Sequence, residues 1–114
     1  MALIYKICSQ ELWDAAKRRG IFEGAPVDLA DGFIHFSTPA QVRETAAKHF
    51  AGQDDLVLVA VDDEALGAAL IYEPSRGGAL FPHLYAPLLL DVVASAEPLR
   101  LGADGRHVFP EDVA

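Results

Sequence analysis

The 114-residue sequence has a single cysteine, Cys8, and no long hydrophobic run. One cysteine cannot form an intramolecular disulfide, so nothing in the chain calls for an oxidising compartment. No apolar stretch approaches the roughly 20 residues that a helix needs to cross a bilayer. Residues 1–6 lack the charged leader and apolar region of a signal peptide. We therefore expect a cytoplasmic protein with no membrane partner.

Positive charge is also scarce. Nine Lys and Arg residues face seventeen Asp and Glu residues, which gives a net charge of -8. Such a charge disfavours approach to a phosphate backbone, so we expect no duplex nucleic acid as a partner. The one basic cluster, residues 17–19, is interpreted as the solvated end of a helix, where cations favour the negative end of the helix dipole.

Apolar residues, in contrast, are plentiful. They make up 52% of the chain, and charged residues make up 23%, which is typical of a globular protein and not of a disordered one. The length fits one domain with a core large enough to fold without disulfides or metals. We predict a single domain over residues 1–114.

Short apolar runs predict β-strands and helical spacing predicts two main helices. Leu12, Trp13 and Ala16 lie on one side of the first helix, which Gly20 ends. The second helix begins with a capping-box pattern at residues 38–41 and ends at Gly52. The strands are expected at residues 3–8, 33–37, 56–61, 70–73 and 96–101, the third of them buried on both faces.

Glycine and proline indicate where regular structure should stop. Residues 22–30 are predicted to be a loop, and Pro74 is expected to end the fourth strand. Prolines near both ends of residues 81–87 indicate an extended, irregular segment at a sheet edge. Strands and helices do not alternate regularly, which favours an α+β fold over a doubly wound sheet.

His35 is the first candidate for a functional residue. It is an ionisable group on a predicted strand, and Ser37 should point the same way because strand side chains alternate. The alternative is structural: His35 bonds a backbone carbonyl while Ser37 takes part in the turn into the helix. Both interpretations stay open at this point.

The second candidate is the segment around His83. Phe81, His83 and Tyr85 are two residues apart, so an extended backbone presents a base, a hydroxyl group and aromatic rings on one side. That set suits a polar ligand with a flat ring. The alternative is that Phe81 and Tyr85 belong to the core and His83 is a surface group at a proline turn.

Glu73 and Arg76 are weaker candidates near a glycine turn. A carboxylate there can orient a ribose hydroxyl and an arginine can bind a phosphate, but charged residues at turns are usually only solvated. No histidine pair has metal-ligand spacing, and no phosphate-binding glycine loop or nucleophile elbow is present. Cys8 lies in a predicted core strand and should be inert.

Three blocks of the sequence resemble a known family. The motifs at residues 4–7 (IYKI), 31–38 (DGFIHFST) and 81–88 (FPHLYAPL) are similar in order and spacing to those of the small bacterial family catalogued as domain of unknown function 952. The second and third blocks are specific. Lys6 stands where members of the family often carry histidine, and Ala86 where many have glycine.

The resemblance implies a compact α+β domain of two small sheets with two main helices, remotely similar in fold to the ADP-ribosyltransferases, which bind NAD. It carries His35, Ser37, His83 and Tyr85 over as the family's pocket, with Glu73 as a looser suggestion. Our hypothesis is a small-ligand pocket in which His35 and His83 are catalytic. Ser37, Phe81, Tyr85 and Glu73 would bind NAD, ADP-ribose or a related phosphate ester, as in a transferase or hydrolase.

The alternative function is a non-catalytic binding or protein-interaction module in which the histidine blocks are structural. The sequence does not say whether the domain is an enzyme, which ligand it takes, or whether it forms oligomers. It also does not say whether His35 and His83 meet in space.

Overall fold

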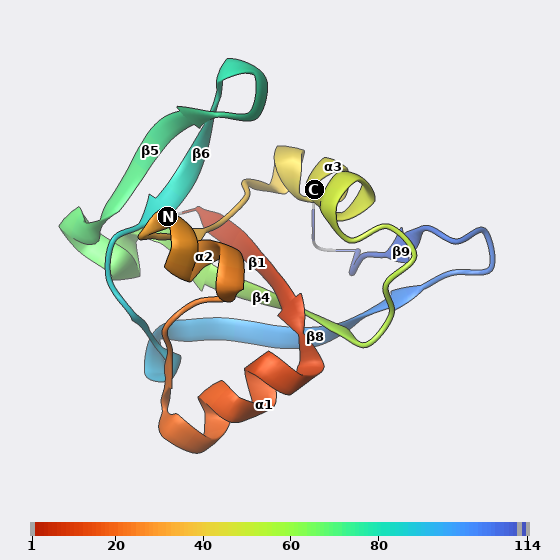
Figure 1. Ribbon diagram of the computed structural model, residues 1–114, viewed down its shortest axis with the longest axis horizontal. Helices are drawn as coiled ribbons and strands as arrows, with labels where there is room; N and C mark the ends of the chain where they lie inside the picture. Colours follow the sequence, from red (N-terminus) through yellow and green to blue (C-terminus); the bar gives the residue numbers. More distant parts are fainter. Residues whose placement is uncertain (1, 112, 114) are drawn as a thin grey trace.

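A computed structural model describes residues 2–111 and 113 of the chain, except the side chain of Arg76. Helices and strands are mixed along it, as the α+β prediction requires (Figure 1). The helices are α1 (Gln10–Arg19), α2 (Pro26–Asp31) and α3 (Pro39–His49), with short 3-10 helices at Asp63–Ala69, Arg76–Gly78 and Leu90–Val92. The strands are β1 (Leu3–Ser9), β2 (Ile21–Phe22), β3 (Ile34–His35), β4 (Leu56–Asp62), β5 (Leu70–Ser75), β6 (Ala79–Leu84), β7 (Leu88–Leu89), β8 (Val93–Leu101) and β9 (His107–Val108).

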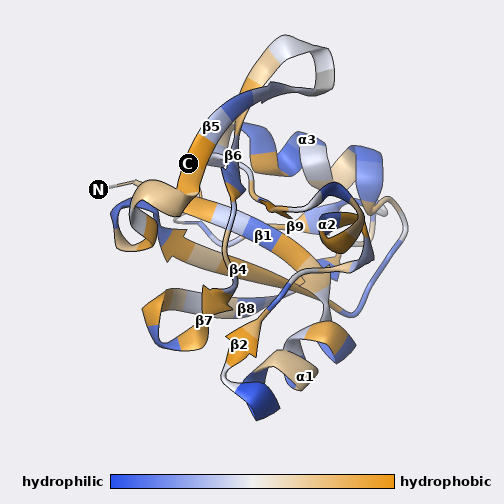
Figure 2. Cartoon of the chain, turned by 60° about the vertical axis from the view of Figure 1, so that its left-hand side comes forward, coloured by the Kyte–Doolittle hydropathy of each residue, from blue (hydrophilic) through white to orange (hydrophobic). Residues whose placement is uncertain are grey.

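The largest sheet has four antiparallel strands in the order β1-β4-β8-β9. Strand β4 runs between β1 and β8 and is hydrophobic along most of its length, whereas β1 has a hydrophilic interruption (Figure 2). All of the residues from Leu56 to Val61 are buried, which confirms the prediction of a strand covered on both faces.

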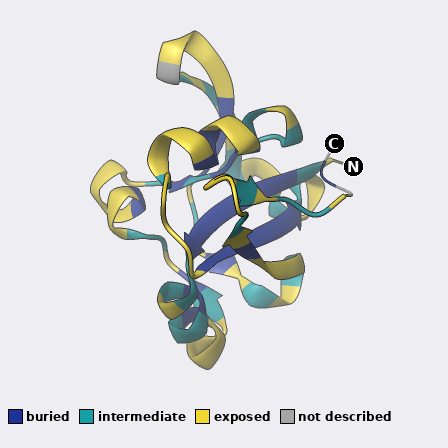
Figure 3. Ribbon diagram, turned by 90° about the vertical axis from the view of Figure 1, so that its right-hand side faces the viewer, coloured by how far each residue is buried: buried dark blue, intermediate teal, exposed yellow. Residues whose placement is uncertain are grey.

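Helices α1 and α3 cover opposite faces of this sheet (Figure 1). One core cluster joins Trp13 and Ala16 of α1 to Val57, Val59 and Val61, and the other joins Val42 and Ala46 of α3 to Leu58 and Ala60. Because successive side chains of β4 point to opposite faces of the sheet, this one strand contributes residues to both core clusters. Figure 3 shows the result: buried strands in the centre and helices that are exposed on their outer sides.

A second sheet of three strands, in the order β3-β6-β5, is attached to the first, and a pair of short strands, β2 and β7, forms a third. The attachment is the isolated bridge between Tyr5 and Ser37, whose backbone N–H groups each donate to the other's carbonyl at 2.8 Å. This bridge holds the segment after β3 against β1. Side chains of both sheets can therefore meet at one place.

The predicted loop at residues 22–30 is wrong, because it contains the start of α2. Pro26 occupies the first turn of this helix, where its missing N–H costs nothing. The Asp28 carboxylate accepts from the backbone N–H of Ala25 at 2.8 Å, and Gly32 ends the helix with φ 86°. A helix of six residues is too short to show a periodic pattern in the sequence.

Two expectations based on proline are also wrong. Strand β5 continues through Pro74, which is tolerated because β5 is at the edge of its sheet. Strand β6 contains Pro82 and yet lies in the middle of that sheet. The carbonyl of Pro82 accepts from Phe36 at 3.0 Å, on the side of β3. A backbone N–H at residue 82 would point to the same side. Proline is tolerated there because β3 is only two residues long and ends at His35.

The other elements agree with the prediction within a few residues. Helix α3 ends at His49, with Phe50 as its cap, and so stops before Gly52. The strand predicted at residues 33–37 is shorter, and the one predicted at 96–101 is longer and is followed by β9. Within the described residues, no helix is long and apolar enough to cross a membrane.

Candidate functional site

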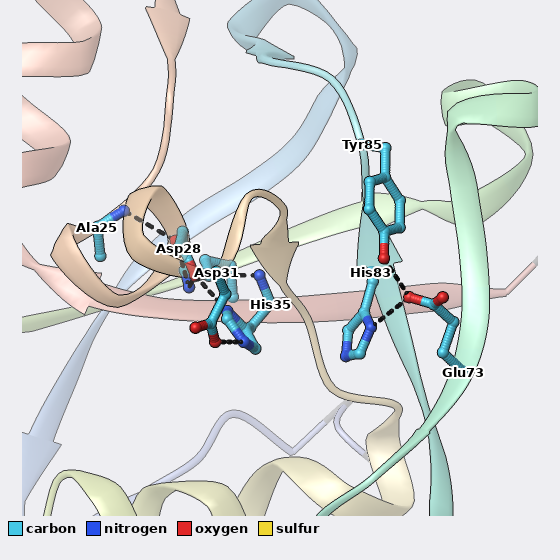
Figure 4. Close-up of polar contacts among 8 residues, drawn as sticks. Ala25, Asp28, Asp31, His35, Glu73, His83 and Tyr85 are labelled. Carbon is cyan, nitrogen blue, oxygen red and sulfur yellow. Dashed lines mark hydrogen bonds and ion pairs between the residues drawn. The ribbon is translucent and has the colours of Figure 1, made fainter.

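His35 and His83 are directly opposite each other on the adjacent strands β3 and β6. Their ring centroids are 5.5 Å apart in an edge-to-face arrangement, and the ring of Phe33 stacks on His83 at 4.1 Å. Figure 4 shows a carboxylate group on the outer side of each ring. The two histidine blocks of the sequence therefore meet in space and form one cluster.

Asp28 holds the His35 side of this cluster together. Its side chain is only 1% exposed, and its two oxygens lie 2.9 Å and 2.8 Å from Nζ of Lys6. The Oδ1 atom also lies 2.6 Å from Nδ1 of His35 and accepts from the His35 backbone N–H at 3.1 Å. A buried carboxylate with this many donors is satisfied, so Asp28 and Lys6 form a structural anchor for His35.

The electrostatics of Asp28 reflect these donors. Burial alone would raise the pKa of the carboxyl, but the hydrogen bond from His35 and the charge of Lys6 outweigh burial and lower the pKa from 3.8 to about 2. Asp28 is therefore ionised at neutral pH.

The other ring nitrogen of His35 faces a different carboxylate. Nε2 lies 3.0 Å from Oδ2 of Asp31, the last residue of α2, whose side chain is 47% exposed. Carboxylate oxygens only accept hydrogen bonds, so each ring nitrogen of His35 faces an acceptor, to which it can donate only when it carries a proton.

Glu73 of β5 orients His83 from the opposite side. Its Oε1 atom lies 2.8 Å from Nδ1 of His83 and accepts from the hydroxyl group of Tyr85 at 2.6 Å. The hydrogen bonds from Tyr85 and His83 lower the pKa of Glu73. The hydrogen bond between Tyr85 and Glu73 also raises the pKa of Tyr85. Glu73 is therefore a carboxylate that fixes the His83 ring.

This arrangement leaves Nε2 of His83 as an acceptor. In the neutral form of the ring, Nδ1 donates to the carboxylate that it faces, and the lone pair lies on Nε2. His83 is 3% exposed, and its Nε2 atom is buried with no hydrogen-bond partner among the residues that the structure describes. Buried polar atoms are nearly always paired, so an unpaired one is a feature that a ligand or a water molecule explains.

A cavity of about 500 Å³ opens next to His35, between β1, α2, β3 and α3. Its polar lining comprises three basic side chains, several hydroxyl groups and the carboxylate of Asp31. The residues that line it are Tyr5, Lys6, Ile7, Val27, Asp31, His35, Ser37, Thr45, His49, Phe50 and Ser75. The Ser37 hydroxyl is 2.9 Å from that of Thr45, which ties the segment after β3 to α3.

The structure distributes the six predicted site residues over several places. His35 and Ser37 line the 500 Å³ cavity, whereas His83 does not: its ring is buried against Phe33 and is held by Glu73. Tyr85 is 46% exposed and lines a different hollow of about 280 Å³, together with Phe33. Phe81 is buried and lines a small hollow of about 100 Å³ below α3.

Other reactive groups and cavities of the described structure lie outside this cluster. Burial raises the pKa of the Cys8 thiol to about 11, so this thiol is inert at neutral pH. Asp62, Asp63 and Glu64 form a cluster of carboxylates, but Asp62 accepts from a backbone N–H and Asp63 from Tyr72. A larger cavity of about 610 Å³ lies between α3 and β9 and contains none of the predicted site residues.

Several residues of the cluster were not predicted from the sequence: Lys6, Asp28, Asp31, Phe33 and Thr45. Lys6 gave a usable signal, because a lysine in an otherwise apolar strand is rarely buried without a partner. Asp28 gave none, since residues 22–30 are predicted to be a loop, and Asp31 appears only as the first residue of the motif at residues 31–38, with no role assigned.

Comparison with known proteins agrees with the resemblance of the three blocks. The crystal structure of protein CC0527 from Caulobacter crescentus is 57% identical in sequence, covers 97% of each chain and superposes with a TM-score of 0.92. The solution NMR structure of the same bacterial protein is 60% identical, covers 93% of this chain and 91% of that one, and has a TM-score of 0.85.

A double mutant of CC0527, with methionine at two positions, is 55% identical and also has a TM-score of 0.92. None of these three structures is described as an ADP-ribosyltransferase, so the likeness to that fold stays a prediction. No curated protein matches the chain. The model of the family described as "Protein of unknown function (DUF952)" matches residues 7–96, and the chain therefore belongs to this family.

Proposed function

We propose that the 500 Å³ cavity binds a phosphate ester of nucleotide size, such as NAD or ADP-ribose, and that the domain acts on this ligand as a transferase or hydrolase. The observation that carries the proposal is a pair of adjoining histidines, each held at Nδ1 by a carboxylate: His35 lines the cavity with Nε2 toward the exposed Asp31, and Nε2 of His83 next to it is buried without a hydrogen-bond partner among the described residues. A phosphate oxygen suits the first atom and a ribose hydroxyl suits the second.

The lining of the cavity supports an anionic ligand. Lys6, His35 and His49 bring basic side chains, and Asp31 is the one acidic residue among the described residues that line it. Basic residues therefore outnumber acidic ones in the lining, whereas the chain as a whole has a net charge of -8. The volume lies within the roughly 300–1,000 Å³ of small-molecule sites.

The orientation of the histidines supports chemistry at the site. A histidine whose Nδ1 is held by a carboxylate presents Nε2 as a base in a fixed direction, and Glu73 holds His83 in this way at 2.8 Å. In a transferase or hydrolase, His83 would accept a proton from a ligand hydroxyl or from water, while His35 would stabilise negative charge on phosphate.

Asparagine variants test the proposal, because the amide nitrogen of asparagine lies close to the position of Nδ1 in histidine. His35→Asn and His83→Asn keep a donor to Asp28 and Glu73 but remove Nε2. We expect each variant to weaken the binding of ADP-ribose by at least about tenfold in isothermal titration calorimetry, as for the loss of a charge-assisted hydrogen bond.

The matched control is His107→Asn, since His107 lies outside the cavity and bonds the carbonyl of Gln53. This variant should bind ADP-ribose like the wild type. Failure of the wild type to bind ADP-ribose or NAD at millimolar concentration would disprove the proposed ligand class.

One observation favours the second function, a non-catalytic module with structural histidines: the ring of His83 is buried and stacked on Phe33 at 4.1 Å. Melting temperatures of the same variants separate the two functions. A large decrease for both asparagine variants, with ligand binding unchanged wherever the variant folds, would support the structural role. Unchanged melting with lost binding would support the ligand site.

A further inference from the structure

We propose that Asp31 occupies the anion position of the cavity in the free domain, and that a phosphate oxygen of the ligand replaces its carboxylate on Nε2 of His35. This inference rests on the proposed function and deepens it. It names the atom that selects the ligand, Nε2 of His35, and the residue that competes for it.

The two carboxylates on His35 differ in how firmly they are held. Asp28 is 1% exposed and is contacted by Nζ of Lys6, the backbone N–H of Ala25, and both the backbone N–H and Nδ1 of His35. Asp31 is 47% exposed, and His35 Nε2 at 3.0 Å is its one hydrogen-bond partner within the described part of the chain. Asp28 therefore stays in place, while Asp31 can leave by a rotation of its side chain into solvent.

The position of Asp31 makes its contact with His35 easy to exchange. It is the last residue of α2, where the negative end of the helix does not favour a carboxylate. An exposed ion pair contributes little to stability, so its loss costs the fold little. A phosphate group that arrives from the cavity offers His35 the same kind of acceptor with a larger negative charge.

The surroundings of Nε2 suit such an exchange. Ser37 and Thr45 bring hydroxyl groups to the same cavity, and Lys6 brings an ammonium group that Asp28 already balances. Once the Asp31 carboxylate leaves, the cavity has no other acidic residue among the described residues that line it. A neutral ligand brings no charge to replace that of the carboxylate at Nε2 of His35, so Asp31 should select anions over neutral molecules.

The test compares Asp31→Asn with wild type for two probes, anionic ADP-ribose and neutral adenosine, by isothermal titration calorimetry. Removing the competing charge should tighten the binding of ADP-ribose by about tenfold, because like charges a few ångströms apart at a partly exposed site interact by roughly that factor. The binding of adenosine should change less than twofold.

The matched control is Asp54→Asn, which removes one exposed charge from the loop between α3 and β4 and should leave both affinities unchanged. Weaker binding of ADP-ribose to Asp31→Asn would show that Asp31 is a ligand contact, and equal binding would show that it is a bystander; either result overturns the exchange. Each leaves the proposed function intact, since the wild type still binds. If neither protein binds ADP-ribose, the proposed function and the exchange fall together.

Discussion

At the scale of single residues, the site depends on how carboxylates use the two nitrogens of each histidine. In both pairs Nδ1 faces a carboxylate, at 2.6 Å for Asp28 with His35 and at 2.8 Å for Glu73 with His83. Nε2 of His35 faces the exposed carboxylate of Asp31, and Nε2 of His83 has no hydrogen-bond partner among the described residues. A carboxylate that fixes the ring and its tautomer is a common means of preparing a histidine for binding or catalysis.

Asp28 also makes the stability of the domain depend on pH. Its pKa is about 2 in the folded chain and close to 3.9 in an unfolded one, so folding favours the ionised form. The stabilisation is complete above the unfolded pKa and is lost as the pH falls through the folded pKa. We expect about 2 kcal/mol to be lost from this source between pH 5 and pH 2.

Urea unfolding at several pH values measures this loss. The reference is the double variant Lys6→Gln/Asp28→Asn, which removes both charges and so avoids leaving a buried ammonium group without its partner. The difference in the free energy of unfolding between wild type and the double variant should shrink by about 2 kcal/mol over this range. Parallel pH curves for the two proteins would contradict the assignment.

At the scale of elements, helix α2 determines where Asp28 and Asp31 lie, and two glycines shape it. Gly24 has φ 126°, and a Cβ atom there would lie 2.8 Å from Cβ of Asp28. Gly32 has φ 86°, but a Cβ atom there would meet nothing within 4 Å. Only the first glycine is required by the close approach of Asp28, whereas both are required by backbone conformation.

Alanine at these two positions should therefore have unequal effects. We expect Gly32→Ala to lower the free energy of unfolding by about 1 kcal/mol, from backbone strain alone. Gly24→Ala should lower it by more, about 2 kcal/mol or above, because the clash with Asp28 is added to the strain. Equilibrium urea unfolding at neutral pH measures both, and equal losses would mean that Gly24 does not hold Asp28 in place.

The sequence predicts long elements better than short ones. Strand β4 is an unbroken apolar run, and α1 has both a serine cap and a terminal glycine, so each was located within a residue or two. Helix α2 has only six residues and is stabilised by contacts of Asp28 with residues far along the chain. No local pattern shows such contacts, so the roles of Asp28 and Asp31 could not be predicted, although Glu73 was a candidate.

The central position of β6 is a further case in which local rules mislead. Two prolines in residues 81–87 indicated an edge, yet the neighbouring strand β3 is too short to need the missing N–H of Pro82. Pairing of β6 with β3 brings His83 opposite His35. The pairing of strands is a property of the whole fold, which explains why the sequence supplied both histidines but not their contact.

At the scale of the whole molecule, the site lies where the two larger sheets join. The bridge between Tyr5 and Ser37 connects β1 to the segment after β3, and Lys6 next to it reaches Asp28 of α2. The cavity is lined from both sheets and from α2 and α3. Ligand binding should therefore affect elements that are distant in sequence, and the larger cavity between α3 and β9 serves as an internal reference.

The most direct test of the ligand site is a nuclear magnetic resonance titration of the ¹⁵N-labelled protein with ADP-ribose. We expect saturable shifts of the backbone amides of Lys6, Asp31, His35 and Thr45, which line the 500 Å³ cavity, and little change at Ala51, Arg106 and Phe109, which line the larger one. Shifts confined to the second group, or none at millimolar ADP-ribose, would contradict the assignment of the histidine cavity as the ligand site.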